Sequence, residues 1–173
     1  LILLSGNTVV YAENQETTFK VAEITAQESE VIKVPVTVSG NKGISGAMLN
    51  ISYDENLKLS DISGGTAFSV LNMTRSGDLN KKSVKILWDG STDDKTNGEI
   101  AVLTFEGINK AGKYAISLEC EKNAVVNSTV QPVQVVTEDG CVVVDKHVHT
   151  GGTATCIRRA ICEKCNQEYG ELD

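Results

Sequence analysis

Proline, histidine, methionine and aromatic residues are scarce in this sequence. Its 173 residues include 2 Pro, 2 His, 2 Met and 1 Trp, and aromatic side chains make up 5% of the chain. Together with 15 Gly and 40% apolar residues, this composition excludes a fibrous or strongly disordered chain and is typical of a globular protein. The shortage of aromatic residues also disfavours a sugar-binding surface built from exposed rings.

Long basic runs are missing as well. The Lys pair at 81–82 and the Arg pair at 158–159 are isolated, and the formal net charge is −7 with a pI near 4.9. This acidity disfavours nucleic acid or an anionic membrane as a partner. It is typical of a soluble, secreted protein.

Recognisable catalytic motifs are absent from the first 145 residues. This part of the chain contains no histidine, no G-x-S-x-G and no H-E-x-x-H. The acidic pairs at 54–55 and 93–94 lie beside Gly, Asn or Lys, where backbone hydrogen bonding favours Asp in turns more than glycosidase chemistry does. We therefore predict that the protein is not an enzyme. Asp89, Asp93 and Asp94 are an alternative as Ca²⁺ ligands, because secreted proteins often bind this ion through loop carboxylates.

The first twelve residues, LILLSGNTVVYA, have the character of the end of a secretory signal peptide. Leu1 to Leu4 are apolar, and Val10-Tyr11-Ala12 fits a cleavage site before the polar ENQETT. An apolar run this short cannot span a bilayer as a helix. We expect residues 1–12 to be a signal-peptide remnant, with an ordinary N-terminal strand as the alternative. Export places the protein outside the cell, where disulfides persist.

Short stretches of alternating apolar and polar residues follow one another from about residue 18 to residue 145. In SVKILWD, for example, Val84, Ile86 and Trp88 share one face, and the run GEIAVLTFE alternates in the same way. Such alternation between turn residues is typical of half-buried antiparallel strands. Pro35 cannot donate to a ladder and is expected on an edge or beside a bulge. Only residues 121–126 are compatible with a turn of helix, so the sequence predicts an all-β sandwich.

The order and spacing of VPVTV, GISGAMLNISYDENLKL, KILWDG, GEIAVLTF, AGKYAISL and DGCVVVD resemble cohesin domains. These are the modules that receive dockerins in bacterial cellulose-degrading complexes. The resemblance covers residues 18–145 and implies a nine-stranded jelly-roll β-sandwich, related in architecture to carbohydrate-binding modules. It also implies a non-catalytic, extracellular role in assembling polysaccharide-degrading machinery. The partner surface is expected on the strands at 44–53, 67–74, 83–89 and 113–120.

Four outward residues are the predicted partner-binding site on that surface: Met48, Asn50, Leu87 and Asp89. An apolar centre with a polar rim is the kind of patch on which helices dock. Many cohesins carry an Asn and an Asp on the outward side of the third strand, where this chain has Gly46 and Met48. Neither can supply an equivalent side-chain hydrogen bond. Direct carbohydrate binding, or a structural spacer in a cell-surface protein, are the alternative functions.

The composition changes after Asp145. Residues 146–173 contain both histidines and three of the five cysteines. The spacing H-x6-C-x5-C-x2-C predicts a zinc-ribbon-like site of His149, Cys156, Cys162 and Cys165, because Zn²⁺ favours tetrahedral thiolate and imidazole ligands. A unit this small needs a metal or disulfide to fold. It also resembles short Cys-rich repeats in surface proteins of gut bacteria.

The remaining cysteines, Cys120 and Cys141, lie at the ends of predicted strands and are a candidate disulfide. Such a bridge would be worth about 3 kcal/mol in the chain-entropy model. It would leave an odd number of cysteines in the C-terminal unit, which favours zinc there, with disulfide bonding or free thiols as alternatives. We expect His147 to be the weaker ligand, pointing away from His149 across the extended segment H-V-H.

Overall fold

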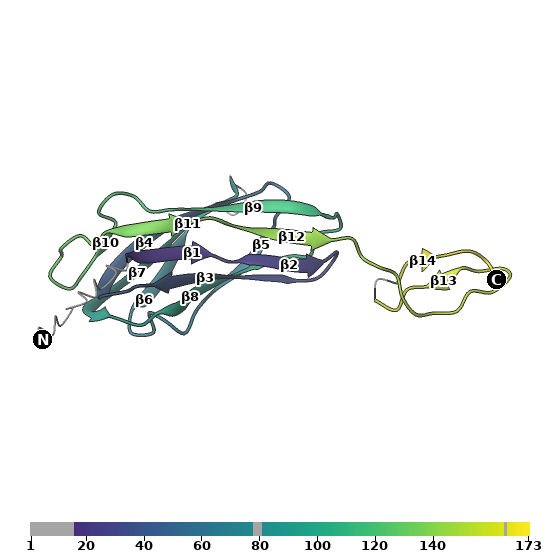
Figure 1. Cartoon of the computed structure of the whole chain (residues 1–173), viewed down its shortest axis with the longest axis horizontal. Helices are drawn as coiled ribbons and strands as arrows, with labels where there is room; N and C mark the ends of the chain where they lie inside the picture. The colour runs from purple at the N-terminus through teal and green to yellow at the C-terminus, as the bar shows by residue number, and fades with distance from the viewer. Residues whose placement is uncertain (1–15, 78–80, 165) are drawn as a thin grey trace, which may run out of the picture.

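Two β-sheets packed face to face form the larger part of the molecule, and a small hairpin unit lies beyond one end of them (Figure 1). The computed structural model describes residues 16–77, 81–164 and 166–173. The predicted signal-peptide remnant, residues 1–12, lies outside the described residues. No helix in the described ranges is long and apolar enough to cross a membrane.

The first sheet has five strands in the order β11-β1-β3-β8-β5. Their bounds are Val135–Glu138 (β11), Thr17–Val21 (β1), Ile32–Ser39 (β3), Gly98–Phe105 (β8) and Leu59–Gly64 (β5). Neighbours are antiparallel except β1 and β11, which run parallel.

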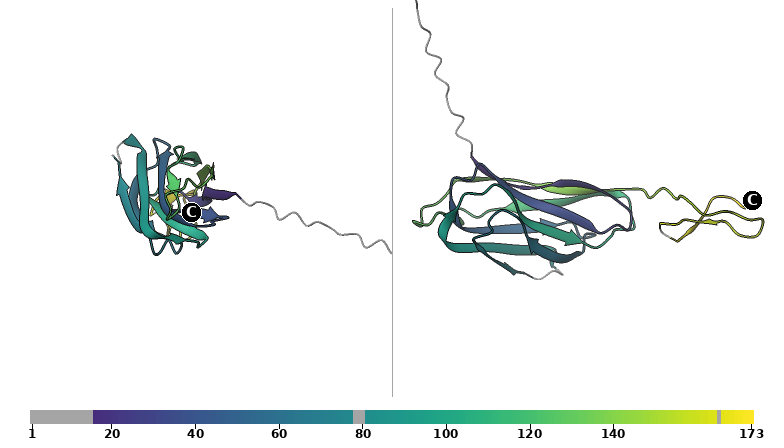
Figure 2. Two further views of the ribbon diagram at one scale, coloured as in Figure 1. Left: turned by 90° about the vertical axis from the view of Figure 1, so that its left-hand side faces the viewer. Right: turned by 90° about the horizontal axis from the view of Figure 1, so that it is seen from below.

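The second sheet follows the order β2-β12-β9-β4-β7-β6, with β10 also paired to β4. Its strands are Glu23–Gln27 (β2), Gly140–Asp145 (β12), Gly112–Glu119 (β9), Ile44–Tyr53 (β4), Ser83–Asp94 (β7), Asn72–Ser76 (β6) and Val125–Val126 (β10). The small unit contains the hairpin of β13 (Ala160–Ile161) and β14 (Glu168–Tyr169). Figure 2 shows the two layers of the sandwich and the hairpin unit beyond β12.

Two nearly continuous chain segments change from the first sheet to the second at neighbouring places. β1 lies in the first sheet and β2 in the second, and the same holds for β11 and β12. β1 runs parallel to β11, and β2 runs parallel to β12. The N-terminal segment (β1 and β2) and the C-terminal segment (β11 and β12) therefore lie side by side, and each contributes one strand to each sheet.

The core lies between the sheets and follows the predicted alternation. Trp88 and Phe105 are 1% and 0% exposed, and Tyr114 is 5% exposed. Each fully buried side chain of this size contributes about 1.5–3 kcal/mol through lost apolar surface. The Phe68 ring meets Trp88 edge to face at 5.8 Å between centroids, a geometry that adds to area burial.

Two local predictions need correction, and one strand was not predicted. The strand expected at 67–74 begins at Asn72, because the segment before it forms turns and Phe68 has a positive φ of 59°. Residues 121–126 contain a turn closed by Ala124 N–H donating to Glu121 O, followed by strand β10 rather than a helix. β11 was not expected, since its short edge segment shows little apolar alternation.

Pro35 lies in β3, between β1 and β8, and therefore in the interior of its sheet. Its carbonyl accepts from Ala22 N–H, just where the chain leaves β1 for the other sheet. A register shift between Val36 and Thr37 lies beside it. The N–H that Pro35 lacks would face the place where the ladder between β3 and β1 ends. The expectation that Pro35 lies beside a bulge is confirmed.

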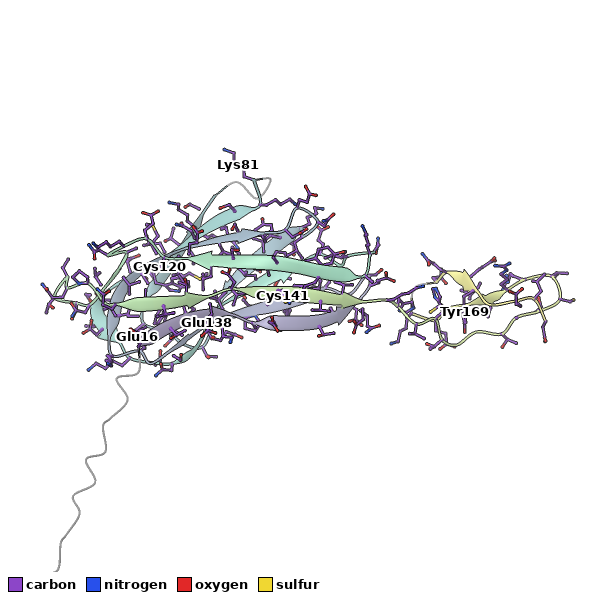
Figure 3. All side chains as sticks on the ribbon, turned by 45° about the horizontal axis from the view of Figure 1, so that its top comes forward. Glu16, Lys81, Cys120, Glu138, Cys141 and Tyr169 are labelled. Atoms are coloured by element: carbon purple, nitrogen blue, oxygen red, sulfur yellow. The ribbon has the colours of Figure 1, made fainter. Side chains whose placement is uncertain are left out.

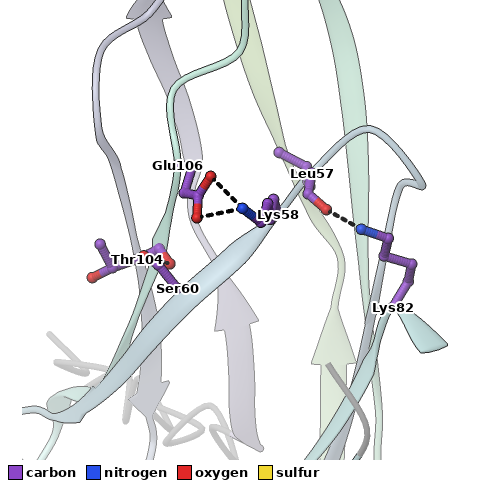
Figure 4. Close-up of polar contacts among 6 residues, drawn as sticks. All are labelled: Leu57, Lys58, Ser60, Lys82, Thr104 and Glu106. Atoms are coloured by element: carbon purple, nitrogen blue, oxygen red, sulfur yellow. Dashed lines mark hydrogen bonds and ion pairs between the residues drawn. The ribbon is translucent and has the colours of Figure 1, made fainter. Parts of the chain in front are cut away.

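A second bulge occurs where β5 pairs with β8. The register shifts between Leu59 and Asp61, and the hydroxyl of the extra residue, Ser60, donates to Thr104 O at 3.0 Å (Figure 4). The Lys58–Glu106 ion pair joins the residue just before β5 to the residue just after β8 at 2.8 Å (Figure 4). These contacts hold the edge strand β5 against β8 despite the interrupted ladder.

Candidate functional site

All four residues predicted to bind a partner lie on the outer face of the second sheet. Met48 and Asn50 belong to β4, and Leu87 and Asp89 to β7. The residues between them, such as Leu49 and Trp88, are buried in the core. We call these four residues the β4–β7 patch.

The centre of the β4–β7 patch is apolar. Met48 lies directly opposite Leu87, and Thr74 of β6 continues the same row on the far side of Leu87. Leu87 is 41% exposed, while Met48 is half-buried. Side chains in directly opposed positions are close enough to form one continuous surface.

The rim of the patch is polar and partly preorganised. Asn50 Nδ2 donates to Glu121 Oε1 at 3.3 Å, and Lys85 Nζ lies 3.5 Å from the same oxygen. Asn50 Oδ1 is buried, and no described residue donates a hydrogen bond to it. Buried acceptors are normally paired, so this oxygen is an exception within the sheet. Sequence reasoning missed Glu121, because only the folded chain brings its loop to the patch.

Gly46 stands at the end of this face for a packing reason. A Cβ at this position would lie 3.1 Å from Cγ2 of Val126, whose strand β10 pairs with β4 at Gly46. The absence of a side chain here therefore makes room for β10. Asp89 lies opposite Gly46 and Asn72 and remains exposed.

The acidic residues of the 89–94 segment have separate roles. Asp93 Oδ1 accepts from Ser128 N–H at 2.6 Å. Asp94 is buried, and its Oδ1 accepts from the backbone N–H of Thr96 at 2.7 Å and from the Thr96 hydroxyl. The pair lies at the end of β7 and not in a turn as expected from the sequence. Asp94 fixes the turn that follows β7, as Asp commonly does, and Asp93 joins β7 to the loop after β10. Among the described residues, they do not form a metal-binding group with Asp89.

The structure does not bring Cys120 and Cys141 together; both are free thiols. Cys141 lies opposite Ala115 in the β12–β9 ladder, whereas Cys120 follows the end of β9. Five residues of extended chain separate these levels by about 17 Å, far beyond disulfide geometry. Figure 3 shows the two cysteines at different places along the strands.

The C-terminal unit brings together a different set of metal-binding side chains from the one predicted. One ligand atom each from His147, His149 and Cys162 lies within 4.8 Å of the others. Cys156 is exposed in the turn that the Thr155–Arg158 bridge closes, and it is not part of this group. Cys165, the other predicted ligand, lies outside the described residues.

The placement of His147 corrects the sequence-based expectation. His147 Nε2 lies 3.1 Å from Cys162 Sγ, and the two histidine rings meet edge to face at 5.0 Å. In an extended segment, residues two apart point to the same side, so H-V-H presents both rings together. The H-V-H spacing already implied this arrangement, and the expectation that His147 points away from His149 was wrong.

Comparison with known proteins identifies the sandwich. The sequence profile of the Cohesin domain matches residues 17–144. No curated protein matches the sequence.

Solved structures share the fold at low sequence identity. A non-cellulosomal cohesin from the archaeon Archaeoglobus fulgidus has a TM-score of 0.68 and 18% identity over 76% of this chain and 92% of its own. The sixth cohesin of Acetivibrio cellulolyticus scaffoldin B, solved with a Cel5 dockerin, has a TM-score of 0.68 and 22% identity over 76% and 100%. A type III cohesin from the cell-surface anchoring scaffoldin ScaE of Ruminococcus flavefaciens has a TM-score of 0.64 and 17% identity over 81% and 93%. With its profile match across most of the sequence and its two-sheet sandwich, the chain belongs to the cohesin domain family.

Proposed function

We propose that the sandwich is a non-catalytic, extracellular module that receives a dockerin-type helical partner on the β4–β7 patch. The observation that carries this proposal is the cross-strand pair of Met48 and Leu87 inside a polar rim. An amphipathic helix binds by laying its apolar side chains on such a surface. Cohesins of the same fold have been solved in complexes with dockerins, which supports the class of partner.

The composition of the patch defines the partner more closely. At Gly46 and Met48 it offers no side-chain carboxylate or amide, so the centre of the interface is expected to be apolar. The exposed side chains of Lys85 and Asp89 supply polar contacts around it. The partner helix should therefore present an aliphatic side chain to Met48 and Leu87, with hydrogen-bond donors at its margin.

The biological setting follows from the partner. A secreted cohesin that holds a dockerin-bearing enzyme contributes to an extracellular polysaccharide-degrading complex. The acidic composition and the predicted signal-peptide remnant support export, and a cell-surface position is proposed on the same basis.

Direct carbohydrate binding is the second candidate function, and the placement of the aromatic residues disfavours it. The aromatic side chains described in the sandwich are all buried: Phe19, Tyr53, Phe68, Trp88, Phe105 and Tyr114. The described surface of the sandwich thus offers no aromatic ring on which a sugar could stack.

A matched pair of substitutions tests the patch. Leu87 and Val136 are both 41% exposed, but Val136 lies on β11 of the opposite sheet. Leu87→Asp should weaken dockerin binding at least about thirtyfold, the loss typical of an interface hot spot. Val136→Asp should leave binding unchanged. Isothermal titration calorimetry against dockerins from the same genome provides the measurement.

A glycan array run with the same samples separates the rival functions. Binding to glycans without any dockerin would overturn the proposal in favour of carbohydrate recognition. The absence of binding in both assays would favour a structural spacer. Equal losses in both Asp variants would show that the partner does not use the β4–β7 patch.

A further inference from the structure

We propose that His147, His149 and Cys162 bind a structural Zn²⁺ ion that holds the C-terminal unit, residues 146–173, in its folded form. This site is independent of the β4–β7 patch and of the function proposed for it. Two imidazole nitrogens and a thiolate sulfur are a donor set that suits zinc. Of the ligands predicted from the sequence, His149 and Cys162 belong to this group, and His147 joins them while Cys156 does not.

The three ligand atoms already stand close to tetrahedral spacing. With Zn–N near 2.1 Å and Zn–S near 2.3 Å, ligand atoms around one zinc lie about 3.3–3.8 Å apart. His147 Nε2 and Cys162 Sγ are 3.1 Å apart, and no pair in the group exceeds 4.8 Å. Movements of about 1 Å would complete the geometry.

The fold of the unit lays the histidine segment over the turn that begins at Cys162. Glu163 N–H donates to Thr150 O at 3.1 Å, and the Tyr169 hydroxyl donates to Gly151 O at 2.5 Å. The His149 ring stacks on Tyr169 at 5.2 Å between centroids. These contacts hold the His149 imidazole close to the sulfur, as supporting residues do around metal sites.

Gly151 and Gly152 allow this close approach. Both have positive φ angles, of 76° and 73°. A Cβ at Gly152 would lie 2.3 Å from Ile161 O, and one at Gly151 would lie 2.4 Å from Cδ of Glu163. The pair of glycines thus bends the chain tightly against the hairpin, which keeps the histidines beside Cys162.

The unit has too little apolar burial to fold by hydrophobic packing. Among the residues described in this unit, the buried apolar ones are Ala160 and Cys162, while Val148 and Ile157 are 71% and 88% exposed. Its two strands have 2 residues each. A hairpin of this size is at best marginally stable in water, and small domains of this kind rely on a metal or a disulfide. Zinc binding would supply the missing folding free energy.

The sandwich also fixes the first ligand. His147 N–H donates to Glu28 Oε2 at 3.0 Å, and Glu28 Oε1 accepts from Ala111 N–H at 3.0 Å. Glu28 therefore joins the loop after β2, the loop before β9 and the start of the C-terminal unit. A metal at His147 would be held at the junction between the two parts of the chain.

The test uses the full chain, reduced and freed of metal, and then titrated with Zn²⁺ or Co²⁺. We expect one zinc per chain by elemental analysis. With Co²⁺ we expect a thiolate-to-cobalt charge-transfer band and the strong visible bands of tetrahedral cobalt. His147→Gln and Cys162→Ser should each weaken zinc binding at least about a hundredfold, more than the loss of a supporting residue. Cys156→Ser is the control and should bind as the unmodified chain does.

A variant expected to increase the cobalt signal distinguishes the loss of a metal ligand from simple unfolding of the unit. His147→Cys places a thiolate where the imidazole was, so it should retain cobalt and strengthen the charge-transfer band. A chain without stoichiometric zinc, or with a disulfide in the unit after purification under air, would overturn the proposal. Equal loss of binding in Cys156→Ser and Cys162→Ser, with none in His147→Gln, would do the same.

Discussion

The thiols of Cys120 and Cys141 are protected by their surroundings. Burial raises the pKa of the Cys120 thiol, and the nearby Glu121 carboxylate adds to the effect. Burial also raises the pKa of the Cys141 thiol, which donates to Glu23 Oε1 at 3.5 Å. Since the thiolate is the reactive form, both should alkylate slowly at neutral pH.

Iodoacetamide labelling with peptide mapping provides the measurement. At about pH 8 we expect exposed Cys156 to react at least about tenfold faster than Cys141, which needs a local opening before it reacts. The labelling rate of Cys120 should continue to rise with pH above the pH at which the labelling rate of an ordinary thiol reaches its plateau. In urea the three should react alike. A Cys120–Cys141 disulfide would contradict this, because both would resist labelling in urea until reduced.

Single residues were predictable wherever a short alternating pattern decides their direction. Trp88 is buried and Leu87 is exposed because adjacent strand residues point to opposite faces. The same rule, applied correctly, places His147 beside His149. The hydrogen bond between Asn50 and Glu121 could not be predicted from local sequence, because Glu121 lies in a loop distant in sequence from Asn50.

At the scale of elements, the crossing between sheets depends on Gly140. A Cβ there would lie 2.6 Å from the carbonyl oxygens of Val21 and Ala22. Gly140→Ala should therefore lower the free energy of unfolding by about 1–3 kcal/mol, the usual cost of overpacking. Thermal or urea denaturation measures the change, and each kcal/mol corresponds to about 2–4 °C in Tm for a chain of this size.

Gly64 offers a matched control in β5. A Cβ at Gly64 meets no atom within 4 Å, so Gly64→Ala should change the stability by less than about 0.5 kcal/mol. If both substitutions had the same small effect, the close contact between the two crossing segments would not constrain the fold.

The elements themselves were predictable to different degrees. The long strands β4, β8 and β9 have clear alternation and were predicted with nearly correct bounds. The strand predicted at 83–89 was too short, because β7 continues through the expected loop to Asp94. β10 and β11 are short edge segments that obtain their conformation from pairing with β4 and β1. The strand at 67–74 was placed too early, because turn formation around Phe68 overrides the apolar content of that segment.

At the scale of the whole molecule, the sequence could not show which elements lie side by side. The parallel pairing of β1 with β11 joins residues more than a hundred positions apart, and Glu28 reaches the C-terminal unit across a similar separation. Recognition of the cohesin pattern supplied the two-sheet sandwich, but neither strand β11 nor its parallel pairing with β1. For the C-terminal unit no such pattern fixed the ligand set, and the choice between Cys156 and His147 depended on the folded chain.

An ion pair joins the edge strands of the two sheets, β5 and β6, on one side of the sandwich. β5 is the last strand of the first sheet and β6 the last of the second, and a cleft of about 260 Å³ lies between them. Arg75 Nη1 of β6 lies 2.9 Å from Asp61 Oδ1 of β5 and also donates to Ile62 O at 2.8 Å. The hydrogen bond from Arg75 holds the pKa of the Asp61 carboxyl below its ordinary value.

This depressed pKa determines the sign of a pH dependence. A carboxyl whose pKa is lower in the folded chain stabilises the fold above its unfolded pKa of about 3.9, and this contribution is lost as the pH falls through the folded value. Asp61→Asn should therefore be less stable than the unmodified chain at pH 7, by a small amount because the pair is exposed. The difference should shrink toward zero near pH 2 in urea denaturation.

Arg75→Gln provides the partner variant for a double-mutant cycle. If Arg75 causes the shift, Asp61→Asn made in the Arg75→Gln background should have the same effect at neutral and acid pH. High salt should reduce the neutral-pH difference, because exposed charges are screened. A pH-dependent difference that persists without Arg75 would mean that some other contact, and not the ion pair between the two sheet edges, holds the Asp61 carboxylate.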